Sequence, residues 1–419
     1  MDFEPSPRVR ELRDRIAEFM DRHIYPAEAE IAAEADLVRP GVPYPPTLLP
    51  IRQKARAAGL WNLFLPDEQY GAGLKNWEYG ILCELMGRSL AAPVAFNCSA
   101  PDTGNIEILA EFGTPEQKKR WLEPLLEGEI RSCFSMTEPE VAGSDPTLLR
   151  TRAVRTGDHW VINGHKWFTS GAIGASVAIV MAVTDPEAAP HLRASMLVVP
   201  IDTPGLNIIR PVPVMGHTGG GGHCEIRYED CRVPAASVLG PVGAGFMIAQ
   251  ARLGPGRIHH CMRAIGGAER ALEMMCRRAN SRIAFGEPLA KKQFVQEMIA
   301  TSRMEIDQAR LLCLHAAWKM DTVGKKEARQ EISMIKVVAA NVFMNVLDRA
   351  IQVHGALGVS DDTPLARMWR DGRMLRLADG PDEVHKMVIA LRELNRWKAD
   401  EAAPQAQPPA AVGAGTGSA

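Results

Sequence analysis

Asp379 lies in a run with the composition of a loop, Leu377–Pro381, directly ahead of a stretch with helical periodicity. A carboxylate in such a place suits two purposes. In a dry pocket that adjusts its pKa it can act as a general base. It can also cap the helix that follows, since aspartate is a favoured N-cap residue. Composition and spacing by themselves favour the cap.

The eight cysteines have neither the spacing of a metal site nor that of a redox pair. No two of them form a CxxC motif, and the sequence contains no HExxH. Scattered cysteines in a chain of this size are most often buried thiols in a reducing compartment. We therefore expect no metal ion, and we expect a cytoplasmic protein.

Glycine-rich segments give no recognisable phosphate-binding loop. The run 219–222 is not followed by Gly-Lys-Ser/Thr, and no GxGxxG follows a strand, so a hairpin-like loop is expected there. Gly355 and Gly358 after a helical stretch indicate a C-terminal cap. The Gly-Pro-Gly within Leu253–Arg257 predicts a helix interruption.

Length and charge exclude several classes of protein. A chain of 419 residues suggests about three domains. Lys plus Arg is 48 and Asp plus Glu is 50, a formal charge of −2, whereas nucleic-acid grooves and membrane-surface patches need a basic excess. We also find no secretory signal and no stretch typical of a membrane-spanning helix. Neither nucleic acid nor a membrane is expected as a partner.

The residues that could do chemistry are distributed over three regions that differ in their hydrophobic periodicity. Residues 1–130 have helical periodicity, and residues 131–238 consist of short β-rich runs, one of which alternates Cys224, Ile226 and Tyr228 with charged residues. Helical spacing returns over residues 239–398 and suggests a bundle. The Ala/Pro/Gln/Gly-rich residues 399–419 are predicted to be a disordered tail.

The segment Phe134–Pro139, followed by Ala-Gly-Ser-Asp at 142–145, resembles the first signature of the acyl-CoA dehydrogenase family of flavoenzymes. The resemblance implies that Phe134, Met136 and Thr137 lie against the flavin, with Thr137 hydrogen-bonded to it. It also implies that Ser144 contacts the CoA part of the substrate. By itself the segment is more typical of a Ser/Thr-rich strand end and turn.

The segment Asn163–Gly171 resembles the family's second flavin segment, in which an aromatic residue covers one flavin face and a hydroxyl residue two positions later binds it. Matching without a gap selects Phe168 and Ser170. A shift of one residue selects Trp167 and Thr169. We favour the first register, and the sequence leaves both open.

Two further segments are similar to those that hold the ADP half of FAD across a dimer interface in the family. One is the Arg-x-x-Phe-Gly at 282–286 with a later glutamine, and the other is the Gln-x-x-Gly at 352–355. Arginine pairs well with a pyrophosphate, although a solvated charge at a helix end is the simpler interpretation of Arg282 alone. The residues that the resemblance implies are Arg282, Phe285, Gln293, Gln352, His354 and Gly355.

These blocks keep the family's order from about residue 8 to residue 398, so the chain is identified as a member of the acyl-CoA dehydrogenase family. Membership implies an α+β, mainly α fold with an N-terminal helical domain, a middle β-barrel-like domain and a C-terminal four-helix bundle. It also implies FAD, an acyl-CoA substrate, a homotetramer built as a dimer of dimers, and transfer of electrons to an electron-transfer flavoprotein.

The family removes a proton from Cα of an acyl thioester and a hydride from Cβ to flavin N5, which yields the trans-2-enoyl-CoA. Most members use a glutamate as base, and the matching residue here is Asp379, one methylene shorter. One branch places the base near Gly256 instead, but residues 250–263 contain no Asp or Glu. The resemblance thus assigns the base to Asp379 and substrate contacts to Arg257 and Gly380.

Residues 97–105, 252–260 and 377–385 resemble a subgroup whose animal members carry a fused kinase-like domain and act on 4-hydroxyacyl-CoAs as well as on saturated acyl-CoAs. Residues 97–105 would line the acyl pocket, so Asp102 and Asn105 are candidates for contact with a polar or phosphorylated acyl chain. Turn formation and helix capping are the alternative. For the whole chain, the alternatives are an oxidase or monooxygenase on the same scaffold and a non-catalytic helical assembly protein.

Overall fold

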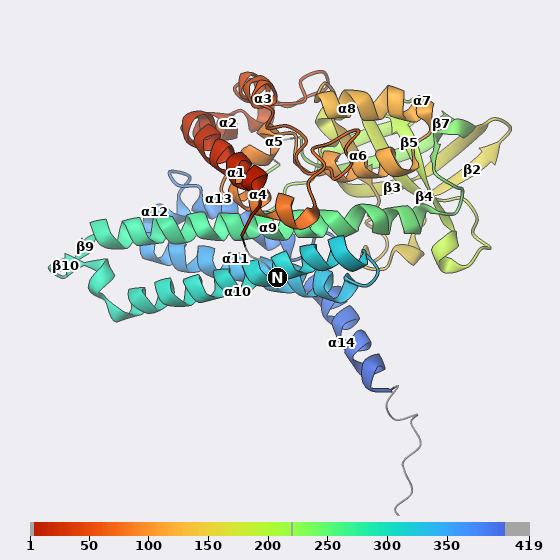
Figure 1. The fold of residues 1–419 in the computed structure, drawn as a ribbon. Coiled ribbons are helices and arrows are strands. Elements are labelled where there is room, and N and C mark those ends of the chain that lie inside the picture. Colours follow the sequence, from red (N-terminus) through yellow and green to blue (C-terminus); the bar gives the residue numbers. More distant parts are fainter. Residues whose placement is uncertain (1–3, 219–220, 399–419) are drawn as a thin grey trace, which may run out of the picture.

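The computed structural model describes residues 4–218 and 221–398, which form a helical part, a sheet and a second helical part in chain order (Figure 1). This order confirms the predicted fold class. The predicted tail, residues 399–419, lies outside the described residues. Among the described residues, no helix has the length and apolar character needed to cross a membrane.

The N-terminal part consists of helices joined by loops and short turns. Helix α1 begins after Ser6, whose hydroxyl accepts a hydrogen bond from Val9 N at 3.3 Å, and Pro7 occupies the first turn. The helices are α1 (Pro7–Phe19), α2 (Glu28–Ala33), α3 (Leu48–Ala57), α4 (Asn76–Gly87), α5 (Ala92–Ala95), α6 (Asp102–Phe112), α7 (Pro115–Gln117) and α8 (Glu123–Glu127).

The middle part is a mixed sheet of eight strands in the order β6-β7-β3-β2-β4-β5-β8, with β1 paired in parallel to β4. The longest strands, β3 and β7, pair antiparallel. The strands are β1 (Ser132–Ser135), β2 (Arg152–Thr156), β3 (His159–Ser170), β4 (Val177–Val183), β5 (Ala194–Pro200), β6 (Leu206–Pro211), β7 (His223–Pro234) and β8 (Val238–Leu239).

Strand β4 links the sheet to the helical parts. All seven of its residues are buried, which is typical of a strand covered on both faces. Val177, Ile179 and Met181 belong to the core shared with the helices, whereas Ala178 and Val180 face the separate core of the sheet. Because β1 lies beside β4, residues that leave β1 emerge at the boundary between sheet and helices.

The C-terminal part is dominated by three long helices, α9, α10 and α11, with α13 and α14 packed on α11. Figure 1 shows α9 running from the sheet to a small hairpin, β9–β10, at the opposite end of the bundle. The elements are α9 (Gly245–Ser281), β9 (Ile283–Ala284), β10 (Glu287–Pro288), α10 (Gln293–Val323), α11 (Arg329–His354), α12 (Ala356–Val359), α13 (Leu365–Leu375) and α14 (Asp382–Lys398).

The predicted interruption at Leu253–Arg257 is wrong, because α9 continues through Pro255. Proline removes one N–H, so the carbonyl of Ala251 four residues earlier loses its helical partner. That carbonyl accepts a hydrogen bond from Lys325 Nζ at 3.5 Å. Pro255 is itself buried, so packing holds the helix where local propensity disfavours it. The cap predicted at Gly355 is confirmed, since α11 ends at His354 and Gly355 has a φ of 65°.

Candidate active site

The two predicted flavin segments lie side by side at the boundary between the sheet and the helices. Trp167 N, near the end of β3, donates to the carbonyl of Thr137, just beyond β1, at 3.0 Å. Lys166 Nζ donates to the carbonyl of Met136 at 2.7 Å. These two hydrogen bonds hold the end of β3 next to the residues that follow β1, which lie about thirty positions earlier in the chain.

A bulge in β3 separates the aromatic residues of the second segment. The pairing with β7 shifts between Lys166 and Thr169, and Phe168 between them has a φ of 51° and is 41% exposed. Thr169 is fully buried, with its hydroxyl 3.2 Å from that of Ser135. Ser170 Oγ lies 2.7 Å from His223 Nδ1 and remains partly accessible. The accessible aromatic–hydroxyl pair is therefore Phe168 and Ser170.

A buried ion pair holds the first segment in place. Lys166 Nζ lies 2.9 Å from Glu138 Oε1, with side-chain exposures of 0% and 1%. Glu138 also accepts hydrogen bonds from the backbone N–H groups of Arg150 and Thr151. Burial lowers the pKa of Lys166 to about 8, although Glu138 opposes this shift. The pair ties the turn after β1 to β3 and to the start of β2.

Asp379 lies in the turn between α13 and α14, with an unusual φ of 55° for a non-glycine residue. Its backbone carbonyl accepts hydrogen bonds from Arg257 Nε at 3.1 Å and from His385 Nε2 at 3.2 Å. Helix α14 begins only at Asp382, so Asp379 does not occupy the cap position that composition favours. Gly380 has a φ of 102°, and a Cβ there would lie 2.9 Å from the His385 ring.

The carboxylate of Asp379 points toward α9. Its Oδ2 lies 3.4 Å from His260 Nε2, and the aspartate side chain is 20% exposed. Burial raises the pKa of Asp379, but the basic side chains around it outweigh burial and hold the pKa below its ordinary value. Asp379 is consequently an ionised carboxylate at neutral pH. The basic side chains are His260, Arg252, Lys336 and Arg257.

Arg252 on α9 packs against Phe134 of the first predicted flavin segment. Its guanidinium carbon is 4.1 Å from the centre of the Phe134 ring, and its Nε donates to Asn105 Oδ1 at 3.0 Å. The residue is 8% exposed, and no carboxylate of the described residues lies within ion-pair distance of it. A buried cation without a direct counter-ion is costly, and burial lowers the pKa of Arg252.

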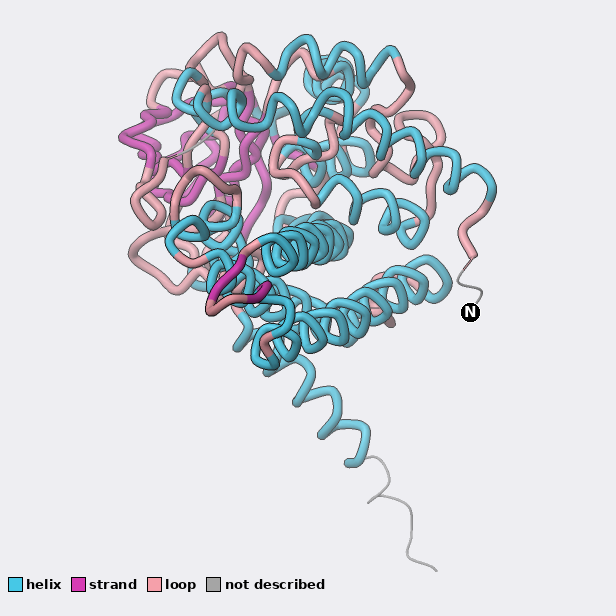
Figure 2. Tube along the Cα trace, turned by 90° about the vertical axis from the view of Figure 1, so that its left-hand side faces the viewer, coloured by secondary structure: helices cyan, strands magenta, loops and turns pink. Residues whose placement is uncertain are grey.

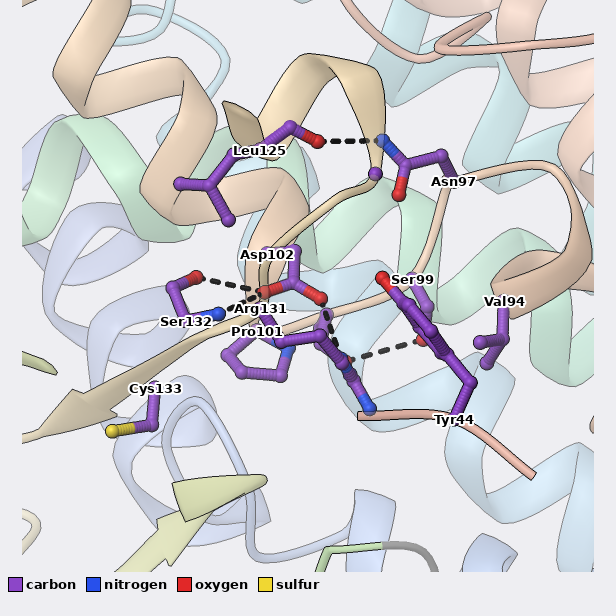
Figure 3. A network of polar contacts seen from close by, with 12 residues as sticks. Tyr44, Val94, Asn97, Ser99, Pro101, Asp102, Leu125, Arg131, Ser132 and Cys133 are labelled. Carbon is purple, nitrogen blue, oxygen red and sulfur yellow. Dashed lines mark hydrogen bonds and ion pairs between the residues drawn. The ribbon is translucent and has the colours of Figure 1, made fainter. Parts of the chain in front are cut away.

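Asp102 and Asn105 do not face an open pocket as the sequence suggests. Asp102 Oδ2 accepts from Arg131 Nε at 3.0 Å, and its Oδ1 accepts from the backbone N and the hydroxyl of Ser132, as Figure 3 shows. Asn105 is fully buried and bonds to Ser132, to the carbonyl of Cys133 and to Arg252. Both side chains therefore join α6 to β1, and their polar atoms are already occupied.

Sequence reasoning missed Arg252, His260 and Arg263 as members of the site. They recur at helical spacing on α9, in a stretch that contains no acidic residue. A row of basic groups without local counter-ions predicts an acidic partner from elsewhere in the fold. That signal was available in the sequence, and the structure places the Asp379 carboxylate within ion-pair distance of one of the three, His260.

Comparison with known proteins identifies the scaffold. Models of the acyl-CoA dehydrogenase N-terminal, middle and C-terminal domains match residues 6–129, 133–231 and 243–394. The chain belongs to the acyl-CoA dehydrogenase family. It is an oxidoreductase with FAD as its cofactor, which confirms the resemblance.

Similar proteins include full-length and partial matches to this dehydrogenase. "Probable acyl-CoA dehydrogenase FadE2" of Mycobacterium tuberculosis is 54% identical over 96% of this chain and 99% of its own length. Mouse "Acyl-CoA dehydrogenase family member 10" is 51% identical over 93% of this chain, but this chain spans only 37% of that protein. A putative acyl-CoA dehydrogenase structure from Mycobacterium abscessus has a TM-score of 0.90, 50% identity and coverage of 94% and 100%.

The residues predicted to bind the ADP half of FAD lie far from the flavin segments within one chain. Figures 1 and 2 show the β9–β10 hairpin at the end of the bundle opposite the sheet. Phe285 on this hairpin is 97% exposed, with a φ of 53°. Arg282, Gln293, Gln352 and Gly355 are also exposed, whereas His354 is buried and its Nδ1 contacts the carbonyl of Ala350.

Two separate groups of residues in the dehydrogenase suit the two halves of FAD. At the sheet, the accessible ring of Phe168 and the hydroxyls of Thr137 and Ser170 suit a flat heteroaromatic ring with polar edges. At the hairpin, the accessible guanidinium of Arg282 and the ring of Phe285 suit a pyrophosphate and an adenine. Ser144 is exposed in the loop after the first segment.

Proposed function

We propose that this dehydrogenase converts an acyl-CoA thioester to the trans-2-enoyl-CoA, with Asp379 as the base that removes the α-proton. The observation that carries the proposal is the ionised Asp379 carboxylate, which lies beside His260 in a turn whose backbone Arg257 and His385 hold. FAD, when bound, supplies the acceptor for the hydride from Cβ. Asp379 takes the proton at a carboxylate oxygen, while Arg257 and His385 keep its backbone in place.

The test is the Asp379→Asn variant, because it removes the base while it preserves size. We expect the purified variant to retain the FAD absorbance spectrum and to lose anaerobic bleaching by an acyl-CoA about 100- to 10,000-fold in rate. Asp361→Asn, at an exposed position outside the group of basic side chains around Asp379, is the matched control and should bleach normally. Normal bleaching by Asp379→Asn would exclude Asp379 as the base.

We propose further that the acyl pocket accepts a chain with an anionic or hydroxyl group, as in 4-hydroxyacyl-CoAs and their phosphates. The support is Arg252, a buried guanidinium without a direct carboxylate partner, close to Phe134 and Asp379. Asn105 serves this role indirectly, because it orients Arg252 through Nε. The resemblance to the kinase-fused subgroup points in the same direction.

Three substrates of equal chain length test this proposal: a plain acyl-CoA, a 4-hydroxyacyl-CoA and its 4-phosphate. We expect the wild type to favour the substituted chains in kcat/KM. Arg252→Gln should lose the preference for the phosphate by about 10-fold or more, since a charge-assisted hydrogen bond contributes roughly 1.5–3 kcal/mol. Equal kcat/KM for all three substrates in the wild type would refute the idea.

We also propose that two copies of the chain share each FAD and that the assembly is a homotetramer. The hairpin lies far from the sheet that carries the flavin segments within one folded chain. A cofactor that contacts both must therefore bridge two copies of the chain. Exposed apolar side chains on α14, on the hairpin and at the start of α10 support assembly. They are Met387, Leu391, Leu394, Ile283, Phe285 and Phe294.

We propose an electron-transfer flavoprotein as the acceptor that reoxidises the enzyme, rather than oxygen. The experiment is to bleach the protein anaerobically with an acyl-CoA and then add either air or an electron-transfer flavoprotein. Fast reoxidation by the flavoprotein and slow reoxidation by air are expected. The reverse order would favour the oxidase alternative.

A further inference from the structure

His260 lies between two side chains that constrain it from opposite edges of the ring. Arg263, one turn later on α9, lies with Nη2 3.0 Å from His260 Nδ1. Asp379 Oδ2 lies 3.4 Å from His260 Nε2. The row Arg263–His260–Asp379 therefore links the long helix to the candidate base.

The Arg263 contact decides which ring nitrogen carries the proton. A guanidinium only donates hydrogen bonds, so Nδ1 of a neutral imidazole must be the acceptor and Nε2 must carry the hydrogen. Burial and the neighbouring Arg263 lower the pKa of His260, so its ring is neutral near pH 7 and gains a proton only in the acidic range where Asp379 also titrates. Arg263 is held in turn by the carbonyl of Cys98, to which Nη1 donates at 3.3 Å.

Nε2 of His260 lies near the carboxylate of Asp379 rather than near its backbone carbonyl. The backbone carbonyl is already fixed by Arg257 and His385, and these contacts set the position of the Asp379 turn. Among the described residues, His260 is the one basic side chain within ion-pair distance of a carboxylate oxygen of Asp379. The 3.4 Å separation exceeds a good hydrogen bond, and such contacts commonly shorten when substrate binds.

We propose that His260 is a positioning residue for Asp379: its Nε2–H, directed by the Arg263 contact on Nδ1, orients the carboxylate toward the substrate Cα. The inference rests on the proposed role of Asp379 as base. An aspartate is one methylene shorter than the glutamate common in this family, so its direction tolerates little error. A displacement of about 1 Å at a reacting group can cost ~100-fold in rate.

The test compares His260→Leu, which removes the donor, with His260→Gln, which keeps an N–H near the position of Nε2. The readout is exchange of the α-hydrogens of a 3-thiaacyl-CoA in D2O, because this analogue can be deprotonated but cannot lose a β-hydride. FAD content, melting temperature, kcat and KM are measured alongside. His315→Leu, at a histidine stacked on Trp318 away from the site, is the control.

We expect His260→Leu to lower the exchange rate and kcat about 10- to 100-fold with little change in KM. His260→Gln should recover most of both, and FAD content and melting temperature should stay near wild type. The acid limb of kcat/KM should move to higher pH in His260→Leu. Other charged groups that face His260 are Arg263 and Arg252 from α9, Asp379 from the turn and Lys336 from α11.

Unchanged exchange in His260→Leu would overturn the proposal, and so would equal losses in His260→Leu and His260→Gln. If His260→Leu fails to fold, the test uses Arg263→Met, which removes the donor to His260 Nδ1 and so no longer fixes the proton on Nε2. Arg263→Lys is its control, because lysine keeps a donor. Unchanged exchange in Arg263→Met then counts against the proposal. Wild-type exchange in Asp379→Asn would instead refute the proposed base, whatever the His260 variants show.

Discussion

Asp379 occupies its place through its backbone as much as through its side chain. A positive φ, the adjacent Gly380 and two hydrogen bonds on its carbonyl bring the turn toward α9. These features give a structural basis for an aspartate where most relatives in the family have a glutamate. The strain of a non-glycine residue at positive φ is typical of functional sites.

The ionisation of Asp379 predicts the acid side of the pH profile. The proposed base would act in its deprotonated form, and the pKa of Asp379 lies below the ordinary 3.8 because basic neighbours outweigh burial. We therefore expect kcat/KM to stay level as the pH falls from 7 to about 5 and to decline only at more acidic pH. The measurement is rapid-mixing kinetics with enzyme held at pH 7 until mixing.

A decline centred near pH 6.5 would contradict this expectation, because it would indicate that a histidine controls the reaction. His260 and His385 are not expected to titrate there. Burial lowers the pKa of His260 to about 3 and that of His385 to about 4. Recovery of full activity on return to pH 7 controls for acid unfolding.

At the scale of elements, β3 carries the lysine that fixes the flavin segment. Lys166 is fully buried, bonds to the carbonyl of Met136 and pairs with Glu138. Its neighbour on the strand, Trp167, holds Thr137 through the backbone. The end of β3 therefore positions the residues that follow β1, and it also leaves the Phe168 ring accessible.

The Lys166→Met variant should lower the free energy of unfolding by about 3–5 kcal/mol, because it leaves the Glu138 carboxylate buried and unpaired. It should also release FAD more readily, since Met136 loses its tether. Urea unfolding and the FAD content after gel filtration measure the two effects. Both are readouts that do not depend on turnover.

The double variant Lys166→Met/Glu138→Gln is the control for the buried charge. It should recover part of the lost stability but not the FAD retention, because the contact to the Met136 carbonyl remains absent. Wild-type stability in Lys166→Met would show that the ion pair does not contribute as the burial of its side chains indicates.

Helix α9 shows how tertiary contacts override a local signal. The Gly-Pro-Gly sequence disfavours a helix, yet the helix continues because Pro255 is buried and Lys325 bonds to the carbonyl that proline leaves unpaired. Continuity matters for the site, since Arg252, Arg257 and His260 span this very region. An interrupted helix would not align them along one face toward Asp379.

At the scale of the whole molecule, α14 projects from the body of the protein (Figure 1). Met387, Leu391 and Leu394 recur at helical spacing and are each more than half exposed. An apolar stripe on a projecting helix is typical of an interface with another chain. This stripe is therefore the place to test assembly.

Leu391→Glu should shift the protein to smaller species, because it places a charge in the centre of the stripe. Lys386→Glu, also on α14 but outside the stripe, should leave the assembly unchanged. Light scattering coupled to size-exclusion chromatography measures the mass of each. Identical masses for Leu391→Glu and the wild type would exclude the stripe as an assembly surface.

The sequence by itself determined the family, the order of helical and sheet regions, FAD and the oxidoreductase class. These follow from motifs that can be recognised from residue types and spacing in the sequence alone. It also marked Asp379 as a candidate base, a role that remains a proposal. The helix cap at Gly355 belongs here as well, because capping depends on neighbouring residues alone.

Only the tertiary structure decided which polar residues are free. Asp102 and Asn105 look like pocket residues in sequence, but Arg131, Ser132 and Arg252 occupy their polar atoms. The same packing brings His260 within 3.4 Å of Asp379, 119 positions later in the chain. Whether a side chain is satisfied or available depends on neighbours distant in sequence, and folding alone brings those neighbours together.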